Sequence, residues 1–236
     1  MISDNTQPKK EDSQEMASII SIEHPFGDYH IFKIKPAKGF QWKPAENIIL
    51  RIPGQINFER NYRFFSIASL PEDEFLLFGT RTGHGISDFK KALLSLAPGS
   101  PVMIEAPWGK FKPKNEKSPL VLYAGGVGIT PFRALILSLA NSHGRPIEIV
   151  YSSSDHHLFG EDIEAAAKGN PDMTLHMLSS REETQETLKR MANKYGNYAY
   201  YFLSSSPQVV KSVKQLLVEN GIFESQIVDE AMEGYE

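Results

Sequence analysis

The sequence predicts two domains, a six-stranded antiparallel Greek-key barrel followed by a doubly wound parallel α/β domain. Short runs rich in Ile, Phe and Tyr, separated by Gly and Pro, fill the first half of the chain. After Lys117, apolar runs of strand length alternate with segments of helical period. We therefore expect a disordered tail over residues 1–16, the barrel over 17–117 and the α/β domain over 118–236.

The composition excludes several kinds of site. The 236 residues carry a net charge of -4, which gives no electrostatic case for binding nucleic acid. The absence of cysteine excludes disulfides, thiolate zinc sites and iron–sulfur clusters held by this chain's own thiolates. It is compatible with a reducing cytosol, so we expect a cytoplasmic protein. The polar N-terminal residues lack the apolar core of a signal peptide, and no apolar run is long enough to span a membrane.

The barrel strands are expected at residues 18–23, 29–35, 47–52, 64–68, 75–80 and 102–105. The fourth of these begins beside Arg63, whose guanidinium suits a bidentate contact with phosphate. Phe65, two positions on, shares a strand face with Arg63, so its ring is placed to stack on a planar group. Ser66 adds a hydroxyl. Alternatively, Phe64 and Phe65 are ordinary core residues.

A second polar segment lies between the fifth strand and a short helix that we expect to run to about Leu96. Gly83, Gly85 and Ile86 form a glycine turn, and Ser87 or Asp88 caps the helix. Backbone N–H groups at such a turn point toward open space, and the helix dipole favours negative charge there. The turn is therefore a candidate anion site.

The α/β domain is expected to contain five strands and four helices. The strands are predicted at 120–123, 147–151, 174–178, 198–203 and 226–228, and the helices at 130–141, 160–168, 184–194 and 207–220. In such a sheet the ligand lies at the carboxyl ends of the strands. Those ends carry residues 125–130, 152–155, 179–181 and 204–207.

The first of these strand ends is a glycine turn with Gly125, Gly126 and Gly128. Thr130 follows as the expected helix N-cap, with Pro131 at the first helical position. A pyrophosphate is the natural occupant of a strand, glycine turn and capped helix. The alternative is a tight turn without a ligand.

The second strand end supplies the residues expected to meet a ribose. Asp155 suits hydrogen bonds from ribose hydroxyls and would repel a 2′-phosphate. No Arg or Lys follows it directly, so NADH is favoured over NADPH. The neighbouring His156 and His157 have no third ligand at a sensible spacing, and we expect surface histidines and no metal site. The four lysines between Gly109 and Ser118 are either a solvated linker or a docking patch for an acidic partner.

These segments together resemble the ferredoxin–NADP reductase superfamily of flavin-dependent reductases. The sequence Arg63-Phe64-Phe65-Ser66 resembles the family's Arg-x-Tyr-Ser/Thr motif, and residues 83–87 resemble its glycine–serine turn. The segment 106–111 resembles the end of the family's barrel, and residues 124–132 resemble its nicotinamide-nucleotide loop. The tail from Glu230 is similar to a Glu-Glu-Phe-x-Gly-Tyr ending found in part of the family.

The resemblance implies that the barrel binds FAD and that the second domain binds NADH or NADPH. Arg63 would bind an FAD phosphate, Phe65 would pack on the isoalloxazine, and Ser66 would hydrogen-bond near N5 as the catalytic residue. The other cofactor-binding residues it implies are Phe64, Gly83, Gly85, Ile86 and Ser87 for FAD, and Gly125, Gly126, Gly128, Thr130, Pro131, Asp155 and Ser205 for the nucleotide.

The sequence also departs from the family pattern. Phe65 replaces the usual Tyr, so the phenolic hydroxyl is lost. Residues 204–207, with three serines and a proline, replace a Cys-Gly-Pro-Pro or Ala-Gly-Pro-Pro segment whose glycine lets the backbone approach the nicotinamide. Met232 replaces an aromatic residue near the C-terminus.

The function that follows from the resemblance is hydride transfer from the nicotinamide nucleotide to FAD. Electrons would then pass to a separate acceptor, such as a ferredoxin or another redox protein. Two alternatives remain: a nucleotide- or flavin-binding regulatory module without turnover, and an electron-transfer subunit that acts only within a larger complex.

Overall fold

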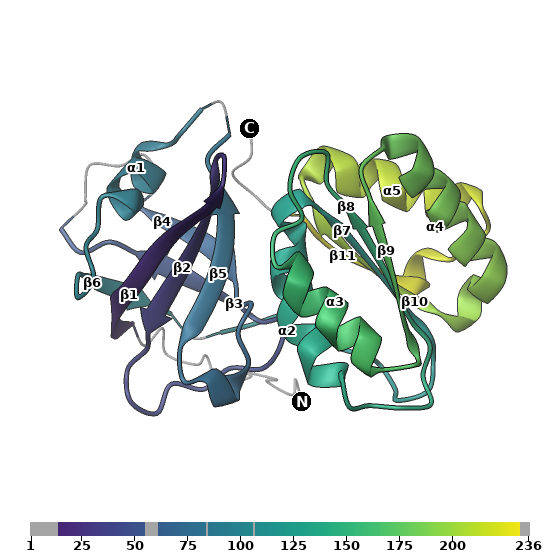
Figure 1. Ribbon diagram of the computed structural model, residues 1–236, viewed down its shortest axis with the longest axis horizontal. Helices are drawn as coiled ribbons and strands as arrows, with labels where there is room; N and C mark the ends of the chain where they lie inside the picture. Colours follow the sequence, from purple (N-terminus) through teal and green to yellow (C-terminus); the bar gives the residue numbers. More distant parts are fainter. Residues whose placement is uncertain (1–13, 55–60, 84, 106, 232–236) are drawn as a thin grey trace, which may run out of the picture.

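The computed structural model describes residues 14–54, 61–83, 85–105 and 107–231. The chain forms two lobes that lie side by side (Figure 1). The first lobe is an antiparallel sheet with one short helix, and the second is a parallel sheet with helices on both faces. The two predicted architectures are therefore confirmed.

Six strands make the first lobe. They are β1 (Glu15–Phe26), β2 (Tyr29–Lys35), β3 (Asn47–Arg51), β4 (Tyr62–Ser66), β5 (Leu76–Arg81) and β6 (Pro101–Ile104), in the order β4-β3-β6-β1-β2-β5. The sheet curls on itself so that its two edge strands, β4 and β5, approach each other. Phe65 of β4 stacks on Phe78 of β5, with ring centroids 4.4 Å apart. The Ala68 amide donates to the Leu77 carbonyl across the same gap.

The boundaries of the first lobe differ from the expected ones in two places. Strand β1 begins at Glu15, inside the segment expected to be a disordered tail; residues 1–13 of that segment lie outside the described residues. The short helix is α1 (Asp88–Leu94), and Ser87 is its N-cap, with its side chain accepting a hydrogen bond from the Lys90 amide. A 3-10 helix, η1 (Pro71–Asp73), precedes β5.

The second lobe alternates strands and helices. In chain order they are β7 (Leu120–Gly125), η2 (Gly126–Gly128), α2 (Ile129–Leu139), β8 (Ile147–Ser152), α3 (Gly160–Gly169), β9 (Met173–Leu178), α4 (Arg181–Tyr195), η3 (Gly196–Tyr198), β10 (Tyr200–Ser205), α5 (Pro207–Glu219), η4 (Glu224–Gln226) and β11 (Ile227–Ala231). The parallel sheet has the order β11-β10-β7-β8-β9, so the direction of winding reverses between β7 and β10.

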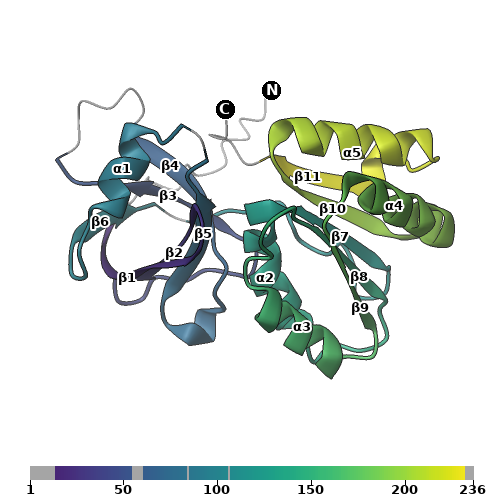
Figure 2. The ribbon, with the colours of Figure 1, turned by 45° about the horizontal axis from the view of Figure 1, so that its top comes forward.

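Two helical layers cover this sheet, with α2 and α3 on one face and α4 and α5 on the other (Figure 2). The central strand β7 is buried on both sides, as its continuous apolar sequence predicts. Leu122 packs with the α2 and α3 layer, whereas the next residue, Tyr123, packs with the α4 and α5 layer.

Helix α2 begins earlier than expected. Its N-cap is Gly128, and the 3-10 turn η2 leads directly into it, so Thr130 is not the N-cap and Pro131 is not the first helical residue. The Thr130 hydroxyl instead donates to the Val127 carbonyl at 2.7 Å. Pro131 still lies within the first turn, where its missing N–H has no intrahelical partner to lose.

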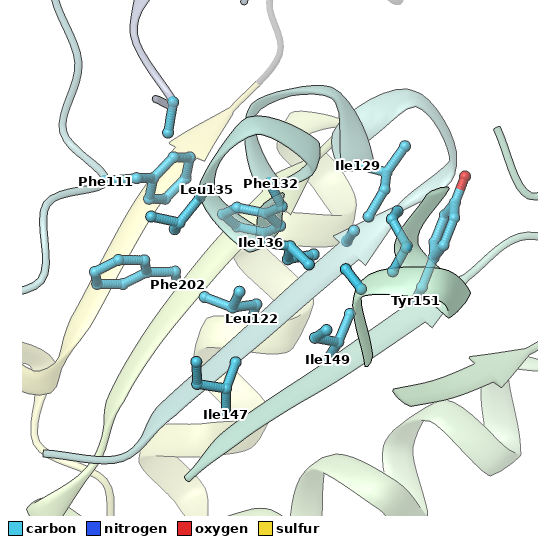
Figure 3. Packing of buried hydrophobic residues seen from close by; sticks show 14 of the residues in the cluster. Phe111, Leu122, Ile129, Phe132, Leu135, Ile136, Ile147, Ile149, Tyr151 and Phe202 are labelled. Carbon is cyan, nitrogen blue, oxygen red and sulfur yellow. The ribbon is translucent and has the colours of Figure 1, made fainter. Parts of the chain in front are cut away.

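The apolar core of the α/β domain extends into the barrel. Phe111, from the segment that follows the barrel strands, packs between Phe132 of α2 and Phe202 of β10, with ring centroids 4.8 and 5.4 Å away (Figure 3). Tyr29 and Ala45 of the barrel belong to the same buried cluster. The two domains therefore share a core, rather than being joined by a solvated linker alone.

One buried carboxylate holds three elements of the α/β domain together. Glu148, near the start of β8, accepts hydrogen bonds from Lys194 and Tyr195 of α4 at 2.9 and 2.7 Å and is 2.8 Å from His176 of β9. Burial by itself would raise the pKa of Glu148, but these hydrogen bonds outweigh it and lower the pKa to about 2. This network lies at the amino ends of the strands, away from the predicted ligand site.

Candidate functional site

A cavity of about 650 Å³ lies at the carboxyl ends of the parallel strands. Its position agrees with the sheet order, because a ligand crevice forms where the winding direction reverses. The lining residues are Arg81, Tyr123, Gly125, Gly126, Val127, Ser152, Ser153, Ser154, Ser179, Arg181, Thr184, Gln185, Leu188, Ser205, Ser206, Gln208, Val209, Ser212 and Val213. None of them is acidic, so the cavity suits an anionic ligand.

The glycine loop forms one wall of the cavity, and its glycines are required for different reasons. A Cβ on Gly125 would collide with the Ser205 side chain, and a Cβ on Gly128 would lie 2.6 Å from the Ser204 carbonyl carbon. Gly126 has a φ of 53°, which favours glycine, and open space around it. Gly125 and Gly128 allow the loop to pack on β10, and Gly126 allows it to turn toward the cavity.

The loop residues that were predicted to bind nucleotide are thus divided into two groups. Gly125, Gly126 and Ser205 line the cavity, together with Val127, which the sequence interpretation had not singled out. Gly128, Thr130 and Pro131 are buried behind the loop, and Thr130 lies against Gly79 of β5 at the domain boundary. Their contribution is to shape the loop.

Asp155 contacts the barrel rather than the cavity. Its carboxylate accepts hydrogen bonds from the Tyr29 hydroxyl at 2.8 Å and from Arg81 at 2.5 Å. Burial would raise the pKa of Asp155, but the bond from Tyr29, the amide of His156 and the charge of Arg81 lower it. The carboxylate is ionised and already paired, so a hydrogen bond to ribose would have to compete with these partners. The role in binding ribose stays a prediction.

Two arginines, one from each domain, line the cavity. Arg181, at the start of α4, follows β9 at the strand end where the sequence placed a polar segment, although no role was assigned to it. Arg81 comes from β5 of the barrel, and its pairing with Asp155 depends on how the domains pack. No sequence signal marks a contact between residues 74 positions apart.

In the barrel, the strand expected to contact the flavin has its residues on two faces. Phe65 is 7% exposed and packs on Phe78 in the barrel core, so it presents almost no free face for stacking. Phe64 points the other way, is 40% exposed and lies edge-on to Trp108 at 5.5 Å. The stacking role that the resemblance implied for Phe65 is therefore not supported by its packing.

The phosphate-binding part of the predicted flavin site has a suitable set of donors. The Arg63 guanidinium lies 5.1 Å from the ring centroid of Phe89, in the first turn of α1, whose N-cap is Ser87. The neighbouring Lys90 is buried, and its pKa is lowered to about 8 by burial and then by the charge of Arg63. Two cations beside a glycine turn fit the diphosphate of FAD. Gly83 and Gly85 have open space around them, and His84 lies outside the described residues.

The two domains meet at Asn47, beside Ser66. Asn47 lies directly opposite Ser66 in the β3–β4 ladder, and its amide donates a hydrogen bond to Glu230 near the end of β11. Burial raises the pKa of Glu230, and its second carboxylate oxygen is buried without a hydrogen-bond partner among the described residues. Sequence analysis had not linked Asn47 to this site. The last five residues, from Met232 on, and Ala106 lie outside the described residues.

Three further expectations can be compared with the structure. Lys114 of the lysine cluster donates to the Ser225 carbonyl at 3.0 Å and lies over the Tyr200 ring, so it is partly engaged within the chain. In the described ranges, no three His, Cys, Asp or Glu side chains are arranged to hold a metal ion. None of the helices described is both long and apolar enough to cross a membrane.

Known proteins resemble this chain in sequence and in structure. The toluate 1,2-dioxygenase electron transfer component of Pseudomonas putida is 28% identical over 189 residues, which cover 76% of this chain and 55% of that protein. The flavohemoglobin of Malassezia yamatoensis, solved with bound FAD and heme, aligns with a TM-score of 0.76 at 20% identity, over 93% of this chain and 60% of the other. The ferredoxin-NADP+ reductase of Plasmodium falciparum with 2'P-AMP aligns with a TM-score of 0.76 at 14% identity, over 92% and 96% of the two chains.

No model of a protein family matches the chain. The chain spans about half or less of the length of the first curated relatives it matches. At the identities given, the solved structures establish the fold. The sequence relatives and the structural neighbours are nevertheless of one kind, ferredoxin reductase-like flavoproteins, and the motifs occur in the same order along the chain. The chain is thus similar to the ferredoxin–NADP reductase superfamily in sequence, and it has the fold of that superfamily.

Proposed function

We propose that this chain is a flavin-dependent oxidoreductase that takes hydride from NADH or NADPH onto FAD and passes electrons to a separate acceptor. The observation that carries the proposal is the meeting of two sites at the domain boundary. Glu230, near the carboxyl end of β11, bonds to Asn47 directly opposite Ser66, so the nucleotide edge of the sheet adjoins the predicted flavin strand. The name of the P. putida relative, an electron transfer component, supports the proposal.

Each domain has a binding task in this proposal. Arg63 and Ser87, with Gly83, Gly85 and Ile86, hold the diphosphate of FAD. The glycine loop and Ser205 hold the nicotinamide nucleotide. Bound FAD supplies the two-electron acceptor, and the protein contributes position rather than acid–base chemistry.

Close packing at the domain boundary sets the relative position of the two sites and excludes water. A Cβ on Gly79 of the barrel would lie 2.5 Å from the Leu158 side chain and 3.2 Å from the Thr130 hydroxyl, so side chains of the α/β domain pack directly on the Gly79 backbone. Arg133 of α2 donates to the Ala68 carbonyl at 2.6 Å, just beyond β4. A rigid boundary of this kind favours a fixed distance between donor and acceptor rings.

Two observations favour different nucleotides, one NADH and the other NADPH. Asp155 would repel a 2′-phosphate, but its charge is paired with Arg81. Arg181 lines the same cavity and supplies a second cation. The preference for NADH stays a prediction, to be tested with both nucleotides.

The acceptor in this proposal is a separate redox protein, such as a ferredoxin, and the location is the cytoplasm. Relatives named as components of dioxygenase and monooxygenase systems support a protein acceptor. The absence of cysteine excludes an iron–sulfur cluster held by this chain's own thiolates. The lysine cluster at Lys110, Lys112, Lys114 and Lys117 offers positive charge for docking an acidic partner.

The test is an absorbance titration of the purified chain without oxygen. We expect a flavin spectrum that bleaches when NADH or NADPH is added in stoichiometric amounts. A flavin that stays oxidised with both nucleotides would exclude the proposal that the chain is an oxidoreductase.

A second candidate is a nucleotide-binding regulatory module without turnover, and the packing of Phe65 on Phe78 favours it. It predicts that nucleotide binds while the flavin stays oxidised, or that no flavin binds. Steady-state reduction of a dye by NADH would exclude it.

A further inference from the structure

One buried tyrosine differs from the others in its hydrogen bonding. Among the described residues, four tyrosines are buried, and only Tyr123 leaves its hydroxyl without a hydrogen-bond partner. The hydroxyls of Tyr29, Tyr151 and Tyr201 each donate to an oxygen atom of the chain, at 2.8, 3.1 and 3.0 Å. A buried polar group without a partner is destabilising and therefore uncommon. The Tyr123 hydroxyl needs an explanation that packing alone does not give.

The hydroxyl of Tyr123 opens on the cavity at the carboxyl ends of the parallel strands. The ring packs with Leu188 of α4 and Val213 of α5 in the apolar layer that those helices form on the sheet (Figure 2). Although the residue is only 4% exposed, it lines the cavity. Its hydroxyl lies 3.2 Å from the place that a Cβ on Gly125 would take, and the Ser205 side chain meets the same place. The hydroxyl therefore lies where the glycine loop packs on β10.

The surroundings of this hydroxyl carry no charge. The charged residues that line the cavity are Arg81 and Arg181, one from the barrel and one at the start of α4. The side chains that pack around Tyr123 are apolar, apart from the hydroxyl of Ser205. Burial raises the pKa of Tyr123 to about 12, so its hydroxyl stays neutral at physiological pH and is able to donate or accept a hydrogen bond. A neutral hydroxyl in such a place suits a sugar hydroxyl, whereas arginines suit phosphate.

The order of the strands indicates which sugar of a dinucleotide lies at this point. Strand β7 pairs with β10, and β10 pairs with β11, which contacts the barrel beside Ser66. Arg181 follows β9, at the far edge of the sheet. A dinucleotide whose nicotinamide lies near Ser66 and whose adenosine lies toward β9 has its nicotinamide-side ribose over Gly125 and Ser205.

We propose that the Tyr123 hydroxyl forms a hydrogen bond with a hydroxyl of the ribose that carries the nicotinamide. The ribose is then the partner that the chain itself does not provide. This inference rests on the proposed function for the identity of the ligand. NADH and NADPH share this ribose, so the contact supports both equally. In the sequence Tyr123 belongs to the apolar run of a buried strand, and no motif marks it as a binding residue.

Tyr201 provides a matched control for Tyr123. Both rings pack in the same apolar cluster, but the Tyr201 hydroxyl donates to the Gly196 carbonyl at 3.0 Å and does not line the cavity. Replacement by phenylalanine removes the hydroxyl and keeps the ring in either case. Tyr201→Phe therefore removes a bond within the fold, whereas Tyr123→Phe removes only a contact with ligand.

The test compares the binding of ADP-ribose and ADP to the full-length holoprotein by isothermal titration calorimetry. ADP-ribose contains the second ribose without the nicotinamide, and ADP lacks that ribose but keeps the adenosine and the diphosphate. We expect Tyr123→Phe to weaken ADP-ribose binding about 3- to 10-fold, as is usual for loss of one neutral hydrogen bond, and to change ADP binding less than about 2-fold. Tyr201→Phe should leave both affinities within about 2-fold of the unmodified protein.

Urea unfolding supplies a second measurement that distinguishes a binding role from a structural one. The midpoint should fall by roughly 0.5 M in Tyr201→Phe, because a hydrogen bond within the fold is lost. In Tyr123→Phe the midpoint should stay the same or rise, because the hydroxyl has no partner in the chain. An equal fall in the two variants would overturn the inference.

Three binding results would also overturn it. One is ADP-ribose binding that is unchanged in Tyr123→Phe. Another is an equal loss for ADP-ribose and ADP, which would mean that the hydroxyl meets a group that both ligands contain. The third is the absence of ADP-ribose binding to the unmodified protein. Failure of the proposed function is a separate result, because ADP-ribose carries no hydride: the flavin would stay oxidised with NADH and NADPH whatever these variants do.

Discussion

Gly128 offers a direct test of how the nucleotide loop packs on the sheet. An alanine Cβ at this position would lie 2.6 Å from the Ser204 carbonyl carbon and 3.0 Å from the Ser205 amide nitrogen. Both atoms are backbone of β10, which pairs with β7 on one side and β11 on the other, so they have little freedom to move. We expect Gly128→Ala to destabilise the chain by about 2–3 kcal/mol, the upper part of the range for overpacking.

The measurement is urea unfolding followed by circular dichroism at 222 nm, because most of the helical residues belong to the α/β domain. With a urea dependence of about 2 kcal/mol per molar, the midpoint should fall by roughly 1 M. Gly169→Ala is the matched control, since its Cβ has no atom within 4 Å and its φ is not in the left-handed region. Gly126→Ala should cost about 1 kcal/mol, from its backbone conformation alone. Equal midpoints for Gly128→Ala and Gly169→Ala would refute this account of the loop.

Three further predictions concern charged residues. The pKa of Glu148 is lowered from an ordinary 4.5 to about 2 in the folded chain, so its ionisation stabilises the fold above pH 4.5. Up to about 3 kcal/mol of the free energy of unfolding should be lost as the pH falls toward 2. Acid unfolding of Glu148→Gln should lack this component, and a profile parallel to the unmodified protein would contradict it. Arg181→Gln should lower kcat/KM for NADPH at least 10-fold and change the value for NADH less than 2-fold, as steady-state kinetics would reveal. Arg63→Ala should weaken FAD binding about 10- to 100-fold in a flavin-release assay, whereas Lys91→Ala, on the exposed side of α1, should retain it; equal retention would exclude Arg63 as a phosphate ligand.

The elements of the fold could be predicted because the local patterns agree with the tertiary structure. Residues 120–123 form a continuous apolar run, which is typical of a strand buried on both faces, and β7 is buried in this way. Ser87 caps α1 as its position before the helix predicted. The predicted start of α2 was wrong by two residues, because a threonine followed by a proline is a strong helix-start signal, whereas the N-cap is Gly128. The 3-10 turn over Gly126–Gly128 begins the helical path earlier than that signal.

The candidate site was predictable only where a motif marks it. The glycine loop and Ser205 were found from the sequence, and they line the cavity. The stacking role of Phe65 stays a prediction, because side chains alternate along a strand and Phe65 lies on the barrel side, where Phe78 packs beside it. Arg81 and Asn47 were missed because their partners, Asp155 and Glu230, belong to the other domain.

The shared apolar core has a consequence for how this chain tolerates rearrangement. Phe111 occupies a hole in the α/β domain, although it precedes the sequence boundary at residue 117. A fragment cut at that boundary would leave the rings of Phe132 and Phe202 facing water, and the separated barrel would expose Tyr29. The two domains are therefore poor candidates for exchange between proteins as independent units. A chimera should keep residues 107–117 with the C-terminal half and should match the barrel surface around Ala45.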